Sequence, residues 1–469
     1  MNAPLESTLW DILGVIEPQR DDWLFRQRII QELQDVVRTV PSLRGATVEP
    51  FGSFVSNLFT PWGDLDITVM LDYDSYISSA GKKRKLSLLG DVLRALKEKG
   101  GWWRLQFIPH AKVPILKFEK GRPAISGDIS IDNLGGQMKS KCLFWLNQID
   151  GRFRPLVLLV KEWAKTQNIN SPKFGTLNSY SLSLLVLFHF QTCEPAIFPP
   201  LQAIYPTNLV DDLTGVRETA EKTIADLFHA NIRRFIADRS RPVNRSSLSE
   251  LFVSFLAKFS TISLKARDFG ISPFTGQWEE INNNTRWFPR TFALYVEDPF
   301  EQPANTARTV SVRNLDRIQE VIQRTQLTIL SPNLTWIDLH QLLVKPELSR
   351  VILFRKQNQN GSGQMMHPLP QQQLPQTRKH VHSPSAPVIA ARVQSARPEN
   401  QLRSRINGNH HIHGLSSNPK QGTYSNSAVP EESNPNKWSK QGMQQQQQQQ
   451  RGDVTNSRQQ LWRPRSQQS

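Results

Sequence analysis

The chain contains only two cysteines, Cys142 and Cys193, among its 469 residues. Neither cysteine belongs to a CxxC pair or to a cluster with histidine, so the sequence indicates neither a zinc site nor a disulfide framework. The most apolar run, SLSLLVLFHF at 181–190, is about half as long as a membrane-spanning helix and contains Ser and His. The N-terminus has no basic segment ahead of its apolar residues, which predicts no signal peptide. We therefore expect a soluble intracellular protein in a reducing compartment.

The sequence also lacks the signatures of RRM, KH and zinc-finger modules, and it shows no internal repeat. Positive charge is present but uneven: residues 356–469 hold 14 Lys and Arg against 4 Asp and Glu, within a net charge of +16 for the whole chain. This tail has seven consecutive glutamines at 444–450 and no apolar periodicity, so we predict that it is disordered. Such a charge favours an anionic partner such as nucleic acid, although solubilising and targeting segments have the same composition.

Apolar periodicity divides the rest of the chain into helical and strand-like parts. Residues 1–40 have helical spacing that ends at Pro41. Residues 41–140 contain five short β-like runs (GATVEPFG, LDITVML, WWRLQFIP, KVPILKF and AISGDISI) and a helix near 82–99. Residues 141–355 are mostly helical, apart from an extended TFALYVEDPFE. The pattern predicts an α+β protein: a sheet domain at 41–140, a helical domain at 141–355 on which segment 1–40 packs, and the disordered tail at 356–469.

Two aspartates stand at the start of the apolar run LDITVML. Side chains alternate faces along a strand, so Asp64 and Asp66 project to the same side. Neighbouring carboxylates repel each other and favour a bound cation, and hard oxygen ligands suit Mg²⁺ or Mn²⁺. Asp128, in the alternating SGDISID, offers a third carboxylate from another strand. A lone DxD is more often a solvated strand end than a metal site, so the choice between the two depends on the surrounding residues.

Gly52 and Ser53 supply that context. A glycine lets the backbone approach a ligand closely, and the following SFVS could begin a helix whose free N–H groups bind phosphate. A phosphate-binding turn, paired aspartates about ten residues later and an isolated strand aspartate beyond them form a layout for nucleotidyl transfer with two metal ions.

Five stretches carry a resemblance to a known family: FGSFVSNLFTPWGDLDITV, GDISIDN, RPLVLLVKEWAK, GTLNSYSLSLLV and VEDPFEQPANTARTV. Over residues 10–330 the chain resembles the DNA-polymerase-β-type nucleotidyltransferases of the noncanonical poly(A) polymerase and terminal uridylyltransferase family. The segment DNLGGQMKSK and the glutamine-rich tail are most similar to plant members that uridylate the 3′ ends of small RNAs lacking 2′-O-methylation. The resemblance implies a nucleotidyltransferase palm at 41–140, a poly(A)-polymerase-associated helical domain at 141–355, and template-independent transfer of UMP from UTP to RNA with release of pyrophosphate.

The resemblance also implies roles for single residues. Asp64, Asp66 and Asp128 would be catalytic and hold the metal ions. The residues implied to contact the nucleotide are Gly52, Ser53, Asn133, Lys161, Lys165, Ser179, Tyr180, Asp298 and Glu301. Without the family resemblance, Lys161 and Lys165 would be interpreted as a solvated stripe of lysines on one helix face. Ser179 would be interpreted as a helix N-cap and Tyr180 as a packing residue.

Two positions depart from the family pattern. Lys139-Ser140 stands where uridylyltransferases often have Asn-Thr, and Ala304 stands where a histidine helps to exclude ATP. A small alanine leaves more room for a purine, so a poly(A) polymerase is an alternative function. A third hypothesis, from another class, is a pseudoenzyme whose tail scaffolds RNA–protein bodies.

The expected partners are UTP and RNA 3′ ends, with unmethylated miRNAs and siRNAs marked for decay as the main substrates and mRNA fragments as a second class. An Argonaute-type protein is expected to deliver the RNA, and no membrane partner is expected. Family resemblance places such enzymes in the nucleus and cytoplasm, including P-bodies. The basic run KKRK at 82–85 fits an RNA-binding face, a solvated helix face or a localisation signal equally well.

Overall fold

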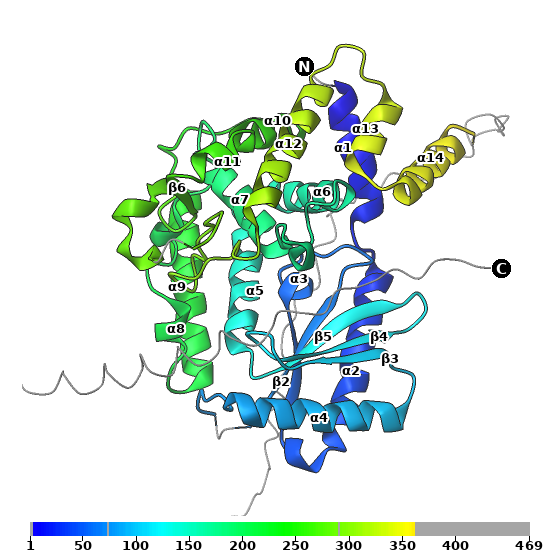
Figure 1. The fold of residues 1–469 in the computed structure, drawn as a ribbon, viewed down its shortest axis with the longest axis vertical. Helices are drawn as coiled ribbons and strands as arrows, with labels where there is room; N and C mark the ends of the chain where they lie inside the picture. The colour runs from blue at the N-terminus through cyan, green and yellow to red at the C-terminus, as the bar shows by residue number, and fades with distance from the viewer. Residues whose placement is uncertain (1–2, 73–74, 289–290, 362–469) are drawn as a thin grey trace, which may run out of the picture. The chain divides into compact units, whose positions relative to one another are not determined.

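The computed structural model describes residues 3–72, 75–288 and 291–361 (Figure 1). All five β-like runs of the sheet domain form strands of one sheet, and the helix expected near 82–99 is also present. The strands are β1 Thr47–Phe51, β2 Leu65–Met70, β3 Trp103–Ile108, β4 Ile115–Lys120 and β5 Ile125–Ile131.

The strand order of this sheet is β1-β2-β5-β4-β3. Strand β2 pairs with β5 in parallel, while the other three pairings are antiparallel. A parallel pair needs a long connection, and here that connection contains α4, β3 and β4. The topology therefore places two strands side by side that are about sixty residues apart in sequence.

Helices cover one face of the sheet and leave the other face open next to β3 and β4. Helix α2 (Arg20–Arg38) and helix α4 (Lys82–Lys99) pack on the covered face, where the apolar residues of alternating strand positions form a buried core (Figure 1). Strand β4 shows this alternation clearly, because Leu116 and Phe118 are buried whereas Lys117 between them is exposed.

The expectation that segment 1–40 packs as one unit on the helical domain is wrong for its second half. Helix α1 (Ala3–Ile16) joins the core of the helical domain, in contact with α6, α10, α13 and α14. Helix α2 instead presents Ile29, Leu33 and Val37 to the sheet. Only the short segment 17–19 separates the two helices. Nothing in the sequence indicates that their apolar faces belong to different cores.

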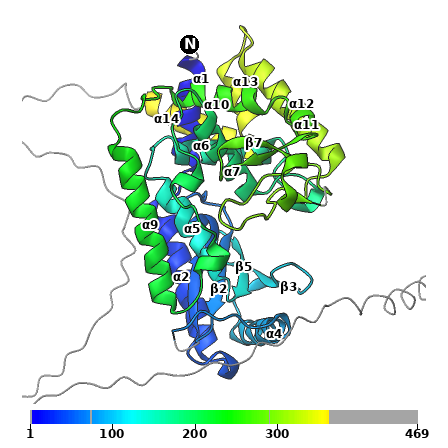
Figure 2. The same cartoon turned by 90° about the vertical axis from the view of Figure 1, so that its left-hand side faces the viewer.

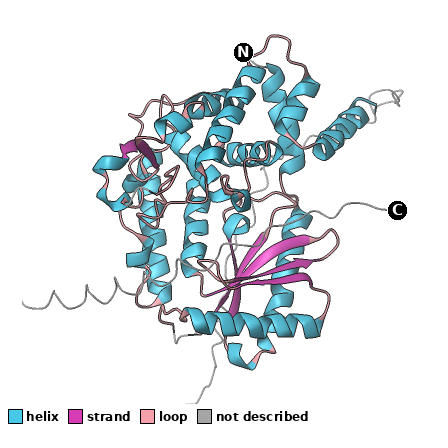
Figure 3. Cartoon of the chain, viewed as in Figure 1, coloured by secondary structure: helices cyan, strands magenta, loops and turns pink. Residues whose placement is uncertain are grey.

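Figure 3 shows that the described part of the chain after β5 is mainly helical. Most residues of two of its helices, α6 and α7, are buried. Apolar residues fill most of the middle of α7, and the polar Ser181, Ser183, His189 and Gln191 are buried as well, so this helix presents no solvated polar face. Figure 2 shows α9 running beside α5, and the two helices are in contact. The helices are α5 Leu134–Leu146, α6 Phe153–Thr166, α7 Ser179–Thr192, α8 Leu209–Asp212, α9 Arg217–Ala237, α10 Leu248–Phe259, α11 Ile262–Lys265, α12 Val312–Ile329, α13 Trp336–Leu343 and α14 Pro346–Gly361, with a small hairpin of β6 Phe269–Ser272 and β7 Gln277–Glu280.

Two other expectations need correction. The segment TFALYVEDPFE is not a continuous strand: it makes isolated bridges from Val296 to Ile271 and from Glu297 to Asn305. The tail, expected to begin at residue 356, begins later, because α14 extends to Gly361. The prediction of disorder for the remaining tail falls on residues 362–469, which lie outside the described residues. None of the described helices is both long and apolar enough to span a membrane.

Candidate active site

Three predicted aspartates meet at the junction of β2 and β5. Asp66 and Asp128 are direct partners in the parallel pair, so backbone register alone sets their carboxylates side by side. Asp64 precedes β2 by one residue, and its carboxylate accepts a hydrogen bond from the hydroxyl of Ser126 on β5. We call these three aspartates the carboxylate row. The structure thus brings together the residues that the sequence placed on one strand face.

The charge of the carboxylate row is only partly balanced by the described residues around it. Asp66 is partly buried, and desolvation together with the negative charges of Asp128 and Asp64 raises its pKa to about 7. Lys117 of β4 lies opposite Asp128 in the sheet and holds it at 2.8 Å from Nζ to Oδ1. Among the described residues, no three acidic, His or Cys side chains already stand as ligands of a single metal ion. Two of the three carboxylates are instead held by neighbours, Asp64 by Ser126 and Asp128 by Lys117.

Gly52 is required by the carboxylate row. Its φ is +68°, and a Cβ at this position would lie 2.1 Å from Oδ2 of Asp66. Its own N–H donates to the hydroxyl of Ser140 at 2.7 Å, and the phosphate binding expected of the N–H groups that follow Gly52 stays a prediction. The helix that follows, α3 (Gly52–Val55), is a single turn. Gly52 and Ser53 therefore lie at the site, and Gly52 acts by letting a carboxylate come close.

A buried arginine that the sequence did not single out fixes the loop before Asp64. Arg26 of α2 is fully buried, and its guanidinium donates to the carbonyls of Thr60, Pro61 and Gly63 at 3.4, 2.9 and 2.7 Å. The same guanidinium lies over the ring of Phe59 at 4.6 Å. Arg26 thereby ties α2 to the segment that leads into the carboxylate row.

Lys161 and Lys165 of α6 lie on the helical side of the site. Lys161 is 6% exposed, and its ammonium donates to the carbonyl of Leu58 at 2.6 Å. Burial and the charge of Lys165 lower its pKa to about 7, although Asp66 and Asp64 act in the opposite direction. Lys165 is more exposed and lies 4.0 Å from the carboxylate of Glu162. Lys161 interacts electrostatically with Asp66 and Asp64, and it also joins α6 to the loop after α3 through its bond to Leu58. The predicted contacts of both lysines with a triphosphate stay predictions.

A second group of side chains lies in the helical domain and contains both matches and departures from the family pattern. Tyr180 of α7 donates its hydroxyl to Asp298 at 3.0 Å. Lys139 of α5 donates to Asp298 at 2.6 Å and to Glu301, and its Nζ lies 6.0 Å from the centre of the Tyr180 ring. We call Lys139, Tyr180, Asp298 and Glu301 the base wall. The departure at 139 therefore contacts directly the two acidic residues that match the family.

Electrostatics stabilise the charged form of Lys139. Burial by itself lowers the pKa of this ammonium, but Asp298 and Glu301 outweigh the burial and raise it. Burial and the nearby Asp298 carboxylate raise the pKa of Tyr180, which keeps its hydroxyl protonated as a donor. Lys112, in the turn between β3 and β4, reaches Glu301 from the sheet domain at 3.3 Å. This ion pair connects the base wall to the sheet.

The remaining predicted residues have structural partners of their own. Asn133 is the N-cap of α5, because its side chain accepts a hydrogen bond from the N–H of Gly136. Ser179 begins α7 and bonds to the side chain of Asn170 at 3.1 Å, while Asn178 is the N-cap. Ala304 lies in a tight turn in which its carbonyl accepts from the N–H of Asp298. The predicted contacts of Asn133 and Ser179 with a nucleotide stay predictions, and Ala304 remains a departure from the family pattern.

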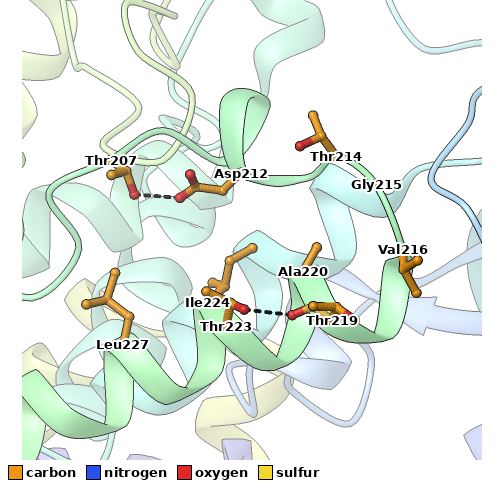
Figure 4. A pocket seen from close by; sticks show the side chains of 10 residues that line it. All are labelled: Thr207, Asp212, Thr214, Gly215, Val216, Thr219, Ala220, Thr223, Ile224 and Leu227. Carbon is orange, nitrogen blue, oxygen red and sulfur yellow. Dashed lines mark hydrogen bonds between the residues drawn. The ribbon is translucent and has the colours of Figure 1, made fainter. Parts of the chain in front are cut away.

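A separate hollow of about 550 Å³ lies between α8 and α9, away from every predicted site residue (Figure 4). Threonines and apolar side chains line it, among them Thr219, Val216 and Ile224. Asp212 at its rim is already bonded to Thr207 and Tyr205. The hollow has no charged group free to carry out nucleotidyl transfer, so the carboxylate row and the base wall remain the candidate site.

Comparison with known proteins finds RNA polymerases and terminal transferases among the matches. Residues 5–146 match the family model of the central palm domain of mitochondrial-like poly(A) RNA polymerases. Protein HESO1 of Arabidopsis thaliana is 62% identical over 330 residues, which cover 70% of this chain and 65% of that protein. The chain thus spans just under two thirds of the length of this relative.

Two solved structures have the same fold. A cytoplasmic RNA terminal U-transferase superposes with a TM-score of 0.56 at 24% identity, covering 73% of this chain and 99% of that chain. The Cid1 poly(U) polymerase with bound MgGTP gives a TM-score of 0.58 at 23% identity, covering 72% of this chain and 99% of that chain. The expected α+β class, with a palm and a helical domain, is confirmed.

Proposed function

We propose that the chain is a member of the DNA-polymerase-β-type nucleotidyltransferase family of noncanonical poly(A) polymerases and terminal uridylyltransferases, and that it transfers UMP from UTP to RNA 3′ ends. One observation carries the proposal: the register of β2 and β5 sets Asp66 against Asp128, and Asp64 joins them through Ser126. A scaffold protein would gain nothing from such an arrangement of repelling carboxylates. The pseudoenzyme alternative is therefore disfavoured.

The carboxylate row fits a divalent cation by its donor chemistry. Three carboxylates offer the hard oxygen ligands that Mg²⁺ and Mn²⁺ prefer, and Gly52 leaves space beside Asp66 where a side chain would intrude. When bound there, the ions would activate the attacking hydroxyl and stabilise the charge on the triphosphate. Asp64, Asp66 and Asp128 would hold them, and binding would require Asp128 to exchange Lys117 for metal.

The chain's own cations and aromatic ring would position the nucleotide. Lys161 and Lys165 would neutralise phosphate oxygens on the helical side of the carboxylate row, and Ser179 would add a hydroxyl donor. Tyr180 would stack on the base, because its ring belongs to the base wall and its hydroxyl is fixed by Asp298. Gly52, Ser53 and Asn133 would lie along the sugar and phosphates.

Lys139 supports a preference for uracil. An ammonium has three N–H donors and no acceptor, and two donors are occupied by Asp298 and Glu301. Uracil offers a carbonyl oxygen, O4, at the position on the pairing edge where adenine has an amino group, and a donor such as an ammonium bonds the first and not the second. The third N–H of Lys139 therefore suits a pyrimidine carbonyl.

Ala304 favours the second candidate, a poly(A) polymerase of the same fold, because a small side chain leaves space for a purine. Replacing it separates the two functions. We expect Ala304→His to raise the ratio of kcat/KM for UTP over ATP by about 5- to 100-fold, the range of a steric or hydrogen-bonding contact. An unchanged ratio would assign base selection to Lys139, Asp298 and Glu301 alone.

The direct test of function uses the purified full-length protein, a labelled single-stranded RNA and each nucleoside triphosphate in turn with Mg²⁺. We expect uridine addition to exceed addition of the other three nucleotides in kcat/KM. A clear preference for ATP would establish the poly(A) polymerase instead. No addition of any nucleotide, by a protein with normal thermal unfolding, would contradict both candidates.

The finer biology is proposed from family resemblance. Unmethylated small RNAs would be the substrates, uridylation would mark them for decay, and an Argonaute-type protein would present them in the nucleus, the cytoplasm and P-bodies. A pull-down with a tagged chain, followed by sequencing of bound RNA 3′ ends, tests this. Recovery of long polyadenylated RNA without small RNA would contradict it.

A further inference from the structure

The open face of the sheet continues past the carboxylate row towards its β3 edge. Asp66 of β2, Asp128 of β5, Lys117 of β4 and Gln106 of β3 are successive partners in one row across the sheet. Neighbouring strands are about 4.8 Å apart, so this row extends roughly 10 Å beyond Asp128. Lys117 and Gln106 are exposed. The carboxylates therefore lie at one end of a polar surface and not in a closed pit.

An irregularity in β3 exposes an aromatic ring and a cation on this surface. The pairing of β3 with β4 shifts register between Trp103 and Gln106, as a β-bulge does, and Arg104 within it has a φ of +49°. A non-glycine residue in this region is strained, and bulges next to active sites often redirect a side chain. Trp103 is 46% exposed and stands opposite Glu119, on the same face as Lys117. Arg104 is 80% exposed and pairs with Glu119 at 2.9 Å.

The neighbouring tryptophan shows that this exposure is specific to one face. Trp102 is buried on the covered face, where its ring packs against Phe118. Alternation along the strand then turns Trp103 to the open face. Trp102 is therefore part of the core, whereas Trp103 is exposed. Trp103 lies two strands away from Ser126, the hydrogen-bond partner of Asp64.

The position of Trp103 along the β3–β4 hairpin relates it to the nucleotide. The turn of the hairpin reaches the base wall through Lys112 and Glu301. Lys117, the partner of Asp128, comes next along β4, and Glu119, the partner of Trp103, comes two residues later. The carboxylate row thus lies between the base wall and Trp103. A group bound at Trp103 would approach the reacting phosphorus from a side that the incoming nucleoside leaves open.

We propose that Trp103, Arg104 and Lys117 form the binding surface for the single-stranded 3′ end of the acceptor RNA. This inference rests on the proposed function and adds the place where the second substrate binds. A base near the 3′ end stacks on the Trp103 ring, which every base can do, and the two cations contact phosphates. This explains how a chain without an RRM or KH signature holds RNA with little dependence on sequence.

Binding measured without nucleotide tests the surface apart from catalysis. Fluorescence anisotropy with a labelled single-stranded RNA should show 10- to 100-fold weaker binding for Trp103→Ala, the range found for loss of one base stack. Trp103→Phe keeps a ring and should bind within about threefold of wild type. Trp10→Ala is the matched control. Trp10 is 53% exposed on α1, a helix that packs in the helical domain, so RNA binding should not change.

Arg104→Gly removes the guanidinium while easing the strained backbone, so the bulge survives. It should reduce the slope of log affinity against log salt by about 0.7, the value for one phosphate contact on a single strand. Steady-state assays of the Trp103→Ala protein should show a raised KM for RNA and an unchanged KM for UTP.

The surface is disproved if Trp103→Ala binds RNA within twofold of wild type, or if UTP and RNA affinities fall together. A wild-type protein that binds RNA through Trp103 but adds no nucleotide would contradict the proposed function and leave the surface standing. Normal nucleotide addition with unchanged RNA affinity in Trp103→Ala would do the reverse.

Discussion

The carboxylate row takes its geometry from backbone pairing, whereas the base wall depends on side chains from three separate segments. Asp66 and Asp128 are neighbours because β2 and β5 are parallel partners. Lys139, Tyr180, Asp298 and Glu301 come from α5, α7 and the segment after β7, and ion pairs and a hydrogen bond join them. The first arrangement persists as long as the sheet does. The second changes with any one of its members, so reaction type should be robust and base choice adjustable.

The largest expected effect comes from neutralising the centre of the carboxylate row. Asp66→Asn keeps the shape but removes one of three negative charges, so transfer with Mg²⁺ should fall by at least about 10³-fold, or about 4 kcal/mol of barrier. Thermal stability should stay equal or rise slightly, because a partly buried carboxylate beside two other negative charges is replaced by a neutral amide. Asp21→Asn, on the exposed start of α2, is the control. Activity within tenfold of wild type would refute the assignment.

A smaller but still large effect is expected from Arg26, which supports the carboxylate row from behind. Arg26→Leu leaves three carbonyls of the loop before Asp64 without their donor, at a cost of about 2–5 kcal/mol in the free energy of unfolding. Chemical denaturation measures this cost, and Arg26→Lys should recover part of it. Arg28→Leu, two residues away and exposed, should change stability by less than about 0.5 kcal/mol. Equal effects at both positions would mean that the buried contacts are not important.

Lys139 tests the base wall in the same way. Lys139→Met leaves Asp298 and Glu301 without their shared cation, so kcat/KM for UTP should fall by about 5- to 150-fold. The value for ATP should fall less, which would bring the two nucleotides closer together. Lys141→Met is the control, because Lys141 pairs with Glu221 of α9 and does not contact the base wall. An equal loss for all nucleotides would show that Lys139 only supports the fold.

The smallest expected effect is a loss of folding stability in acid, and it arises in the helical domain. His189 of α7 is completely buried, and burial with the charge of Lys258 lowers its pKa from 6.5 to about 3. Below pH 6.5 the imidazole of His189 binds a proton in the unfolded chain but not in the folded chain. The free energy of unfolding is therefore highest above pH 6.5 and declines as the pH falls towards 3. The decline should be on the order of 1–3 kcal/mol by pH 4.5. His189→Gln should flatten that part of the unfolding profile, and an unchanged profile would exclude this histidine as its source.

These differences also explain what the sequence could predict. The order of Gly52, the Asp64–Asp66 pair and Asp128 predicts the carboxylate row, because strand alternation and pairing are local rules. Lys139 was visible only as a departure from a pattern. Nothing local in the sequence indicates that its ammonium would lie between Asp298 and Glu301, about 160 residues away. Predictions from sequence were reliable where the backbone determines position and incomplete where long side chains from distant segments meet.

Arg26, which supports the site, was not predicted, and the reason is related. Arg26 lies in an amphipathic helix as one basic residue among several, and its burial depends on a loop 34 to 37 residues later. The five strands of the sheet domain, by contrast, were all found, since β-branched and alternating runs between turn residues have a local signature, whereas the short β6 and β7 were not. Segment 1–40 shows the same limit: its helices were predicted, but the two cores to which they belong were not.

Gly52 has a consequence for how this chain tolerates change. An alanine there would meet the far end of the Asp66 carboxylate, which can swing aside, and the left-handed backbone would cost roughly 1 kcal/mol. The folded protein should therefore survive Gly52→Ala, while the displaced carboxylate would leave its place in the row. A library of random variants sorted for folding alone should keep alanine at this position, and the same library sorted for nucleotide addition should discard it. This glycine would pass for a structural residue by its conformation, yet it is selection for the reaction that would preserve it.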